Sequence, residues 1–424
     1  MAQLSDDCFA FSGPLMPLAD MEKLIAERVQ PVAETEVVSL NDARGRVIAE
    51  NIASLLDLPP FDNSAVDGYA VRHRDLAATA ETKLKVTGRL TAGKSAPEPI
   101  SPGQAVRIFT GAPMPPGADT VFMQEDVQVE GDTVILPPGL KPGSNSRLTG
   151  EDVKKGAVVL PAGRRLATQD IALAAGIGLT RLKVRRRVRV ALFSTGDEIV
   201  EPGQPRPNAA TYDANRYLLS GMLERLGATV TDLGIIKDEP ASLVKAIGEA
   251  ARTNDLVLTS GGVSTGEADY VRDAVEKVGK LVFWRVAIKP GRPVAMGVIP
   301  GSSPGTSAAF MGLPGNPVAA FVTFARVARP LLLRLAGALP EPLIALPVRL
   351  SFAYKKKSGR REYVRVSLRR AADGTVEAVK HPQDGAGVIT SLTETDGLAE
   401  IAEEVATLEA GATVGFLSYA TLIG

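Results

Sequence analysis

The sequence has few of the side chains that bind transition metals or act as catalytic bases. Its 424 residues include one cysteine, Cys8, and two histidines, His73 and His381. A single cysteine cannot form an internal disulfide, and zinc sites need several Cys or His ligands. Neither histidine lies near a G-x-S-x-G motif, which disfavours a serine hydrolase. We therefore expect the chemistry to use carboxylates, hydroxyls, backbone amides, lysine and arginine.

Net charge and long apolar runs are also lacking. The 48 basic and 48 acidic side chains cancel, so the broad basic field that nonspecific nucleic-acid binding needs is not expected. The basic runs 181–189 and 355–361 carry no interleaved aromatic residues and are read as solvated faces. No stretch of about 18 consecutive apolar residues occurs, and residues 1–18 do not resemble a signal peptide. We expect a cytoplasmic protein with no membrane or nucleic-acid partner.

Length and composition indicate a globular protein of several modules. Apolar residues make up 45% of the chain and charged residues 23%, which is typical of a folded protein with a real core. At roughly 100–200 residues per domain, two to four modules are expected.

Residues 184–336 have the pattern of an α/β domain. Short β-rich runs alternate with amphipathic segments, which predicts a parallel-rich sheet covered by helices on both faces. The expected strands are 188–195, 229–235, 255–260, 281–288 and the run AAFMG (308–312). The expected helices are 213–227, a segment after Pro240, 268–279 and a long helix from Asn316.

The rest of the chain is expected to form three other units. Residues 55–152 are rich in Pro, Gly and short β runs and predict a β-rich inserted domain. Residues 1–54 and 153–183 flank it and are expected to pair as a connecting domain. Residues 337–424 predict a small β-barrel-like domain, with a hairpin at Asp373-Gly374. The fold class is thus multidomain, three-layer α/β plus all-β.

Loops that carry glycine, proline, acids and lysine follow the expected α/β strands. In open parallel sheets, ligands bind beyond the carboxyl ends of the strands. Five such loops would therefore meet at one edge of the sheet: 195–198, 237–240, 260–269, 289–293 and 312–317.

An anion site is predicted at this edge. Ser260, Gly261 and Gly262 offer backbone N–H groups that can approach a phosphate closely, and a helix N-terminus follows. Lys289 and Arg292, in a loop stiffened by prolines, can contact phosphate oxygens. The alternatives are an ordinary strand-to-helix turn and a solvated loop.

A magnesium site is also predicted there. Glu198, Asp238 and Asp269 would bring carboxylates to the phosphate site, and clustered carboxylates without histidine suit a hard cation. Taken singly, Asp238 and Asp269 are better interpreted as acids that cap a helix, whereas the three acids together favour a metal or water-positioning role.

Two polar segments of the β-rich insertion, 61–70 and 109–113, are surface turns by composition alone. Arg147 with the pair Glu151-Asp152 is read as an exposed ion pair, which contributes little to stability.

Taken together, the motifs resemble those of the molybdopterin molybdenumtransferase family, and the C-terminal catalytic region of gephyrin is similar. The resemblance extends over nearly the whole chain, in the same order. It rests on DNSAVDGYA (62–70), RIFTGAPMPPGAD (107–119), the segment 147–152, ALFSTGDE (191–198), YDANR (212–216), SGGVSTGEADY (260–270), AIKPGRP (287–293) and GLPGNPV (312–318).

The resemblance implies an elongated homodimer in which the β-rich insertion completes the active cleft of the partner subunit. It implies Mg²⁺-dependent hydrolysis of adenylated molybdopterin, with release of AMP and insertion of molybdenum from molybdate. The implied catalytic residues are Asp67, Thr110, Arg147, Asp152, Glu198, Asp238 and Asp269. The implied pterin and phosphate contacts are Ser260, Gly261, Gly262, Lys289, Arg292, Pro314, Gly315 and Pro317.

Within this interpretation, Glu198, Asp238 and Asp269 hold the metal, while Arg147 and Thr110 are candidate donors to molybdate. No residue of the C-terminal domain is assigned a role. A molybdopterin adenylyltransferase is a candidate partner, and tungstate is an alternative oxyanion. Other readings are a pyridine-nucleotide or ADP-ribose hydrolase built on the same α/β domain, and a non-enzymatic scaffold.

Overall fold

A six-stranded mixed sheet organises the central domain of the computed structural model, which describes residues 15–94, 98–263 and 270–423. Four strands are mutually parallel and two form an antiparallel hairpin at one side. The order is β16 (Thr229–Ile236), β13 (Arg189–Thr195), β17 (Leu256–Ser260), β21 (Ser307–Leu313), β20 (Pro293–Pro300) and β18 (Lys280–Arg285). The predicted α/β class with a parallel-rich sheet is confirmed.

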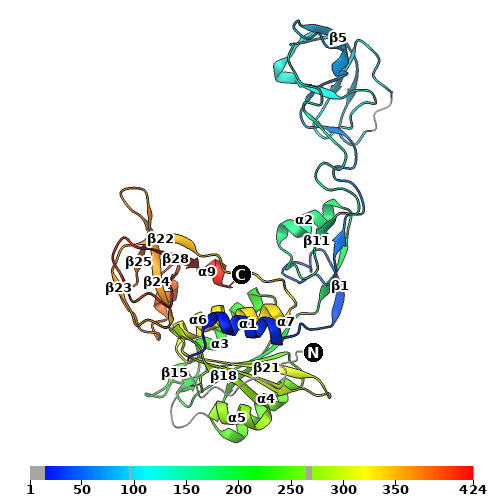
Figure 1. The fold of residues 1–424 in the computed structure, drawn as a ribbon. Helices are drawn as coiled ribbons and strands as arrows, with labels where there is room; N and C mark the ends of the chain where they lie inside the picture. The colour runs from blue at the N-terminus through cyan, green and yellow to red at the C-terminus, as the bar shows by residue number, and fades with distance from the viewer. Residues whose placement is uncertain (1–14, 95–97, 264–269, 424) are drawn as a thin grey trace.

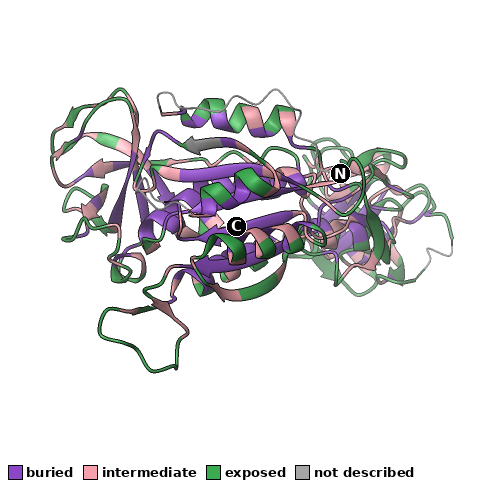
Figure 2. Cartoon of the chain, turned by 90° about the horizontal axis from the view of Figure 1, so that it is seen from below, coloured by how far each residue is buried: buried purple, intermediate pink, exposed green. Residues whose placement is uncertain are grey.

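Helices cover both faces of this sheet (Figure 1). One face packs against α4 (Pro240–Ala251) and α5 (Tyr270–Val278) through a core that contains Phe193 and Phe310. The other face has a larger core, built with α1 (Leu18–Arg28), α3 (Asn215–Arg225), α6 (Pro317–Thr323) and α7 (Arg329–Leu335). A π-helical turn, Phe324–Ala328, joins α6 to α7. Figure 2 shows the buried strands between helices whose outer faces are exposed.

Strand β20 was not predicted from the sequence. Its segment, PVAMGVIP, is a short apolar run between prolines, and apolar runs of this length do not distinguish a strand from other buried structure. Because β20 is antiparallel to both of its neighbours, β18 runs in the same direction as β21. The loop 289–293 therefore still emerges at the carboxyl edge of the parallel strands.

The segments that flank the β-rich insertion form a connecting unit. Strand β1 (Thr35–Ser39) pairs antiparallel with β12 (Arg181–Arg185), and β2 (Ile52–Ala53) pairs with β11 (Val158–Leu160). Helix α2 (Thr168–Gly176) completes a small core with these strands.

The insertion itself is a distal β module, which Figure 1 shows at the far end of the connecting unit, away from the central sheet. Its six-stranded sheet has the order β7 (Thr120–Met123), β4 (Gly68–Val71), β6 (Gln104–Ile108), β5 (Thr82–Leu90), β9 (Thr133–Leu136), β8 (Gln128–Glu130). At its base, β3 (Asn63–Ser64) pairs with β10 (Ser146–Arg147). Short 3₁₀ turns occur at His73–Asp75 and Gln124–Asp126.

The C-terminal region is a closed β-barrel, as predicted. Strands β22 (Leu346–Leu350), β24 (Arg361–Arg370), β25 (Val376–Lys380), β26 (Gly397–Ile401) and β28 (Thr413–Ser418) pair in a ring that the β24–β26 ladder closes. Smaller elements are β23 (Tyr354–Lys355), β27 (Thr407–Leu408), α8 (Thr390–Thr393) and α9 (Tyr419–Ile423). Strand β19 (Ile288–Lys289), from the central domain, adds to β24 and attaches the barrel.

None of the helices in the described residues combines the length and apolar content needed to cross a bilayer.

Removal of the Phe193 side chain should destabilise the central domain selectively. Phe193 is fully buried on β13, and large-to-small changes of buried phenylalanine cost about 3–5 kcal/mol. Urea unfolding of Phe193→Ala, followed by hydrogen exchange of the β13 amides, should show a lower midpoint than the wild type. The exposed barrel residue Val376, changed to Ala, is the control and should leave this transition in place.

Candidate functional site

The carboxyl ends of three adjacent parallel strands meet at one edge of the central sheet. Ser260 at the end of β17 is in register with Ser194 of β13 on one side and with Leu313 of β21 on the other. The amide of Gly261 donates to the carbonyl of Leu313 over 3.0 Å. The loops after these strands are therefore neighbours because the strand register aligns their starting points.

The turn after β17 is one that only glycine can form. Gly261 and Gly262 have φ angles of 93° and 67°. A Cβ on Gly261 would lie 2.3 Å from the carbonyl oxygen of Thr195, and one on Gly262 would lie 2.3 Å from Val271 Cγ2. Close packing against β13 and α5 thus already requires both glycines, and their backbone is left at the edge where the predicted anion would sit.

Asn215, the first residue of α3, ties two of these loops together. Its Nδ2 donates to Ser260 Oγ and to the carbonyl of Gly315, both over 2.8 Å. Ser260 Oγ in turn donates to the carbonyl of Pro314 over 3.3 Å. Asn215 Oδ1 is buried and has no hydrogen-bond partner among the described residues. No role for Asn215 was predicted from the sequence, although an asparagine at the start of an amphipathic helix is a signal for one.

Three acidic residues gather at the neighbouring ends of β13 and β16. Asp238 Oδ1 accepts a hydrogen bond of 3.3 Å from Thr195 Oγ1. Burial raises the pKa of Asp238 above its ordinary value, and the nearby charges of Asp197 and Glu198 raise it further. This edge thus has an excess of negative charge that a cation would relieve.

The predicted metal site is only partly visible. Glu198 and Asp238 lie at the acidic end of the edge, whereas Asp269 falls outside the described residues, as does the rest of 264–269. Among the residues described, no three His, Cys, Asp or Glu side chains are arranged to hold a metal ion. The three-carboxylate site stays a prediction.

Lys289 faces the C-terminal barrel. Strand β19 places it opposite Glu362 on β24, and its Nζ lies 3.2 Å from Glu362 Oε2. Arg292, in the same loop as Lys289, is exposed. Pro317 begins α6, and the side chain of the preceding Asn316 makes no capping hydrogen bond.

A cavity of about 510 Å³ lies between the central domain and the barrel. Its lining contains four cationic and two acidic side chains, with Pro314 and Asn316 from the loop after β21. The charged lining residues are Lys289, Lys355, Arg365, Lys380, Glu362 and Asp384. Because Pro314 belongs both to this wall and to the loop edge, the cavity adjoins the predicted anion site.

Arg365 is the buried cation of the cavity. Its guanidinium donates to Ser391 Oγ over 3.0 Å and to the carbonyls of Gln383 and Gly385 over 2.9 and 3.1 Å. These partners are neutral, so no carboxylate pairs directly with it; burial lowers its pKa, and the nearby charge of Asp384 opposes this shift. Arg365 was not predicted from the sequence, although an arginine inside the β run YVRV, with buried residues on both sides, signals a buried charge.

Glu362 is the buried acid of the same cavity, with a side chain only 1% exposed. Burial opposes its ionisation, but hydrogen bonds from Tyr354, Lys289 and Arg360 outweigh this and lower its pKa. The donor-to-acceptor distances are 2.8, 3.2 and 2.8 Å, respectively.

The other predicted catalytic residues lie in or at the base of the distal β module. Asp67 Oδ1 accepts hydrogen bonds of 2.8 Å from both the amide and the hydroxyl of Thr110, and these bonds lower the pKa of Asp67. Arg147 on β10 pairs with Glu151 over 2.6 Å, and the amide of Asp152 donates to Leu58. Figure 1 shows this module well away from the central sheet of the same chain. One chain thus presents two separate groups of predicted residues.

Comparison with known proteins agrees with this architecture. The chain is 38% identical to the molybdopterin molybdenumtransferase of Haemophilus influenzae over 97% of its own length and 100% of that protein. It is 38% identical to the Nostoc protein of the same name, over 86% of the chain and 84% of the relative. The chain belongs to the molybdopterin molybdenumtransferase family. The resemblance read from the sequence motifs is therefore confirmed.

The domain matches and a solved structure support the family membership. The MoeA N-terminal region (domains I and II) matches residues 16–178, a probable molybdopterin-binding domain matches 191–334, and the MoeA C-terminal region (domain IV) matches 347–419. A molybdopterin biosynthesis MoeA protein from a Pyrococcus species has a crystal structure with TM-score 0.71 and 33% identity, covering 96% of this chain and 99% of that one. Members of the family are transferases of molybdenum cofactor biosynthesis.

Loss of the Asn215 amide should loosen the loop edge of this family member. Asn215→Ala removes two hydrogen bonds, each contributing about 0.5–1.5 kcal/mol to stability, and leaves the carbonyl of Gly315 without this donor. We expect faster hydrogen exchange at the Gly261 amide than in the wild type. Asn254→Ala is the matched control, because Asn254 Nδ2 also makes two hydrogen bonds but lies beyond the end of α4. Equal exchange in both variants would contradict a tie through Asn215.

The lowered pKa of Glu362 predicts how stability depends on pH. A carboxyl with a depressed pKa stabilises the folded state above its ordinary pKa of 4.5, and this contribution is lost as the pH falls through the folded-state value. The wild type should therefore exceed Glu362→Gln in thermal midpoint at pH 7, and the gap should close on acidification below 4.5. A gap that widens at low pH would contradict this sign.

Proposed function

We propose that this chain inserts molybdenum into adenylated molybdopterin, with Mg²⁺-dependent hydrolysis of the pyrophosphate bond and release of AMP. One observation carries the proposal: donor-rich loops, an acidic edge and a cationic cavity adjoin one another in a member of the molybdopterin molybdenumtransferase family. The names of the relatives state molybdenum transfer, and the hydrolysis of an adenylated intermediate is our own step beyond them.

Hydrolysis of a pyrophosphate needs charge neutralisation and an aligned water more than a covalent nucleophile. The amide of Gly262 can bind phosphate oxygens, whereas that of Gly261 already donates to the carbonyl of Leu313, and Lys289 adds a cation at the adjoining cavity wall. Asn215 and Ser260 hold the two loops in place. Glu198 and Asp238 can orient the attacking water and accept its proton, because both carboxylates lie at the same edge.

The acidic edge fits Mg²⁺. Its donors are carboxylate oxygens, the ligand type that Mg²⁺ prefers, and the raised pKa of Asp238 reflects its burial and the neighbouring charges of Asp197 and Glu198. Glu198 and Asp238 would hold the ion together with the predicted Asp269. When bound, Mg²⁺ neutralises charge that develops on the phosphate oxygens.

We further propose that the cavity beside the barrel receives an anionic group of the reactants. Arg365 and Lys355 have no carboxylate hydrogen-bonded to them among the described residues, whereas Lys289 and Lys380 are paired. A tetrahedral oxyanion such as molybdate accepts hydrogen bonds from such groups. Arg147, the donor expected from the sequence, is instead paired with Glu151 on the distal module.

A homodimer would unite the two groups of residues. Asp67, Thr110 and Arg147 lie on the distal module, far from Glu198 and Asp238 in the same chain (Figure 1). The distal module of one subunit can complete the loop edge of its partner in a symmetric dimer, which is the commonest oligomer. In this arrangement each active cleft contains residues from both subunits and forms only in the dimer.

The activity is tested by measuring AMP release from adenylated molybdopterin with molybdate and Mg²⁺. Glu198→Gln and Asp238→Asn should each reduce turnover by about 100-fold or more, as losses of general acid–base groups do. Glu249→Gln, an exposed acid on α4, is the control and should retain turnover. Release of AMP from ADP-ribose but not from adenylated molybdopterin would instead support a nucleotide hydrolase.

The shared cleft is tested by mixing two inactive variants. Asp67→Asn and Glu198→Gln, unfolded together and refolded as a mixture, should regain about a quarter of wild-type activity. Half of the dimers are then mixed, and each mixed dimer has one intact cleft of two. Recovery should not occur when each variant is refolded alone. A mixture as inactive as its components would contradict a cleft shared between subunits.

The cavity is tested by Arg365→Met. Loss of this buried guanidinium should raise the KM of the anion that occupies the cavity by about 10-fold, a loss of one charge-assisted hydrogen bond. A rise for molybdate alone assigns the cavity to the oxyanion, and a rise for adenylated molybdopterin alone assigns it to a phosphate. Unchanged KM values for both would refute an anion site there.

A further inference from the structure

Three arginines converge where the connecting unit joins the central domain. We call Arg46, Arg185 and Arg187 the arginine crevice. They lie beside the start of β13, at Arg189, whereas the candidate site lies beyond its end, at Thr195. Seven strand residues at about 3.3 Å each separate the two by about 20 Å. The crevice is thus independent of the site described above and of the function proposed for it.

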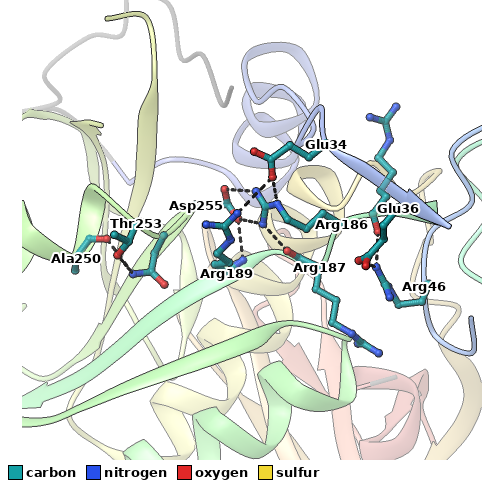
Figure 3. A network of polar contacts seen from close by, with 11 residues as sticks. Glu34, Glu36, Arg46, Arg186, Arg187, Arg189, Ala250, Thr253 and Asp255 are labelled. Atoms are coloured by element: carbon teal, nitrogen blue, oxygen red, sulfur yellow. Dashed lines mark hydrogen bonds and ion pairs between the residues drawn. The ribbon is translucent and has the colours of Figure 1, made fainter. Parts of the chain in front are cut away.

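The charge of the neighbouring Arg186, by contrast, is neutralised by carboxylates. Its guanidinium makes two hydrogen bonds to Asp255, of 2.9 and 3.0 Å, and also pairs with Glu34 (Figure 3). The side chain of Arg187 points away from Asp255 and leaves this network (Figure 3). Its Nη1 donates instead to the carbonyl of Gly227, over 3.0 Å.

The crevice has more positive charge than its partners neutralise. Arg46 is buried and pairs with Glu36, a half-exposed carboxylate. Arg185 donates to the carbonyl of Val32 over 2.9 Å, and its Nε is buried with no hydrogen-bond partner among the described residues. Backbone carbonyls accept hydrogen bonds but do not cancel a charge. Within the part of the chain that the structure describes, the three guanidiniums of the crevice therefore share one carboxylate, that of Glu36.

The excess positive charge affects the pKa of Arg187. Burial lowers the pKa of Arg187, and the charge of Arg46 lowers it further, with Glu36 opposing. Buried charges are normally paired, so this arrangement is costly without a counter-ion. An anion beside Arg187 would offset both effects.

A small cavity opens between these side chains. Its volume is about 20 Å³, room for a single small ion or for the leading oxygens of a tetrahedral one. Every polar side chain in its lining is an arginine, and the remaining walls are glycine, alanine, valine and leucine. The polar side chains of the lining can thus donate hydrogen bonds but cannot accept them, which favours an anion over water.

We propose that the arginine crevice binds a small inorganic anion, which joins the connecting unit to the central domain. The walls come from both sides of this joint: Gly45 to Val47 from the connecting unit, and Leu226 to Ala228 with Leu332 from the central domain. The occupant is chloride or an oxyanion such as sulfate or phosphate, recognised by the same guanidinium donors. A bound anion therefore sets the attachment of the distal module.

Thermal unfolding of the full chain tests this site. Chloride, sulfate and phosphate are each titrated at constant ionic strength against gluconate, an anion too bulky for the cavity. The anion that binds should raise the melting temperature by about 2 °C or more, along a saturating curve. Arg187→Met should abolish the saturating rise. Arg181→Met is the matched control, because Arg181 lies on β12 and donates to a backbone carbonyl outside the crevice, and it should keep the rise.

A direct measurement separates binding from general stabilisation. The line width of the ³⁵Cl resonance should broaden on addition of wild-type protein and narrow again when phosphate competes for the crevice. Arg187→Lys keeps the charge but loses the planar guanidinium, so it should fold and bind the anion at least several-fold more weakly. The proposal is overturned if none of the three anions gives a saturating rise. It is equally overturned if Arg187→Met and the wild type respond alike.

Discussion

The parallel register of β13, β17 and β21 is the constraint on which the rest of the candidate site depends. Because Ser194, Ser260 and Leu313 are aligned across the three strands, the loops that follow them start from one line. The strand ends are fully buried, so they cannot shift without opening the core of the sheet. A rigid scaffold of this kind holds short polar loops in place more firmly than the loops could hold themselves.

Attachment of the barrel adds the second half of the site. Lys289 lies on β19, which pairs with β24 of the barrel, and its side chain pairs with the buried Glu362, so hydrogen bonds link the central domain to the barrel. The cavity forms between the central domain and the barrel rather than within either domain. Its cations, among them Arg365, therefore reach the loop edge only because two domains of the chain are fixed against each other.

Much of this could be predicted from sequence, for a physical reason. Alternating strands and amphipathic helices specify a parallel-rich sheet, and parallel strands bring loops such as Thr195–Glu198 and Ser260–Gly262 to one edge. Local pattern did not reveal β20, whose short apolar segment has no period that identifies it. Local pattern could point to Arg365 and Asn215 but not to the groups that they bind, because those partners lie at least 18 residues away in sequence and only the fold brings them together. The separation of Asp67 from Glu198 is likewise a property of the folded chain.

The connecting unit has a consequence for how this architecture can be dissected. The chain leaves and re-enters the central domain through two adjacent antiparallel strands, with Ser39 of β1 opposite Arg181 of β12. Antiparallel neighbours can be bridged by a two-residue turn. Residues 40–180, which lie between these two strands, can thus be removed as one unit. Excising it and closing the gap with Asn-Gly would leave both cut ends already paired, so the remaining body would retain its topology.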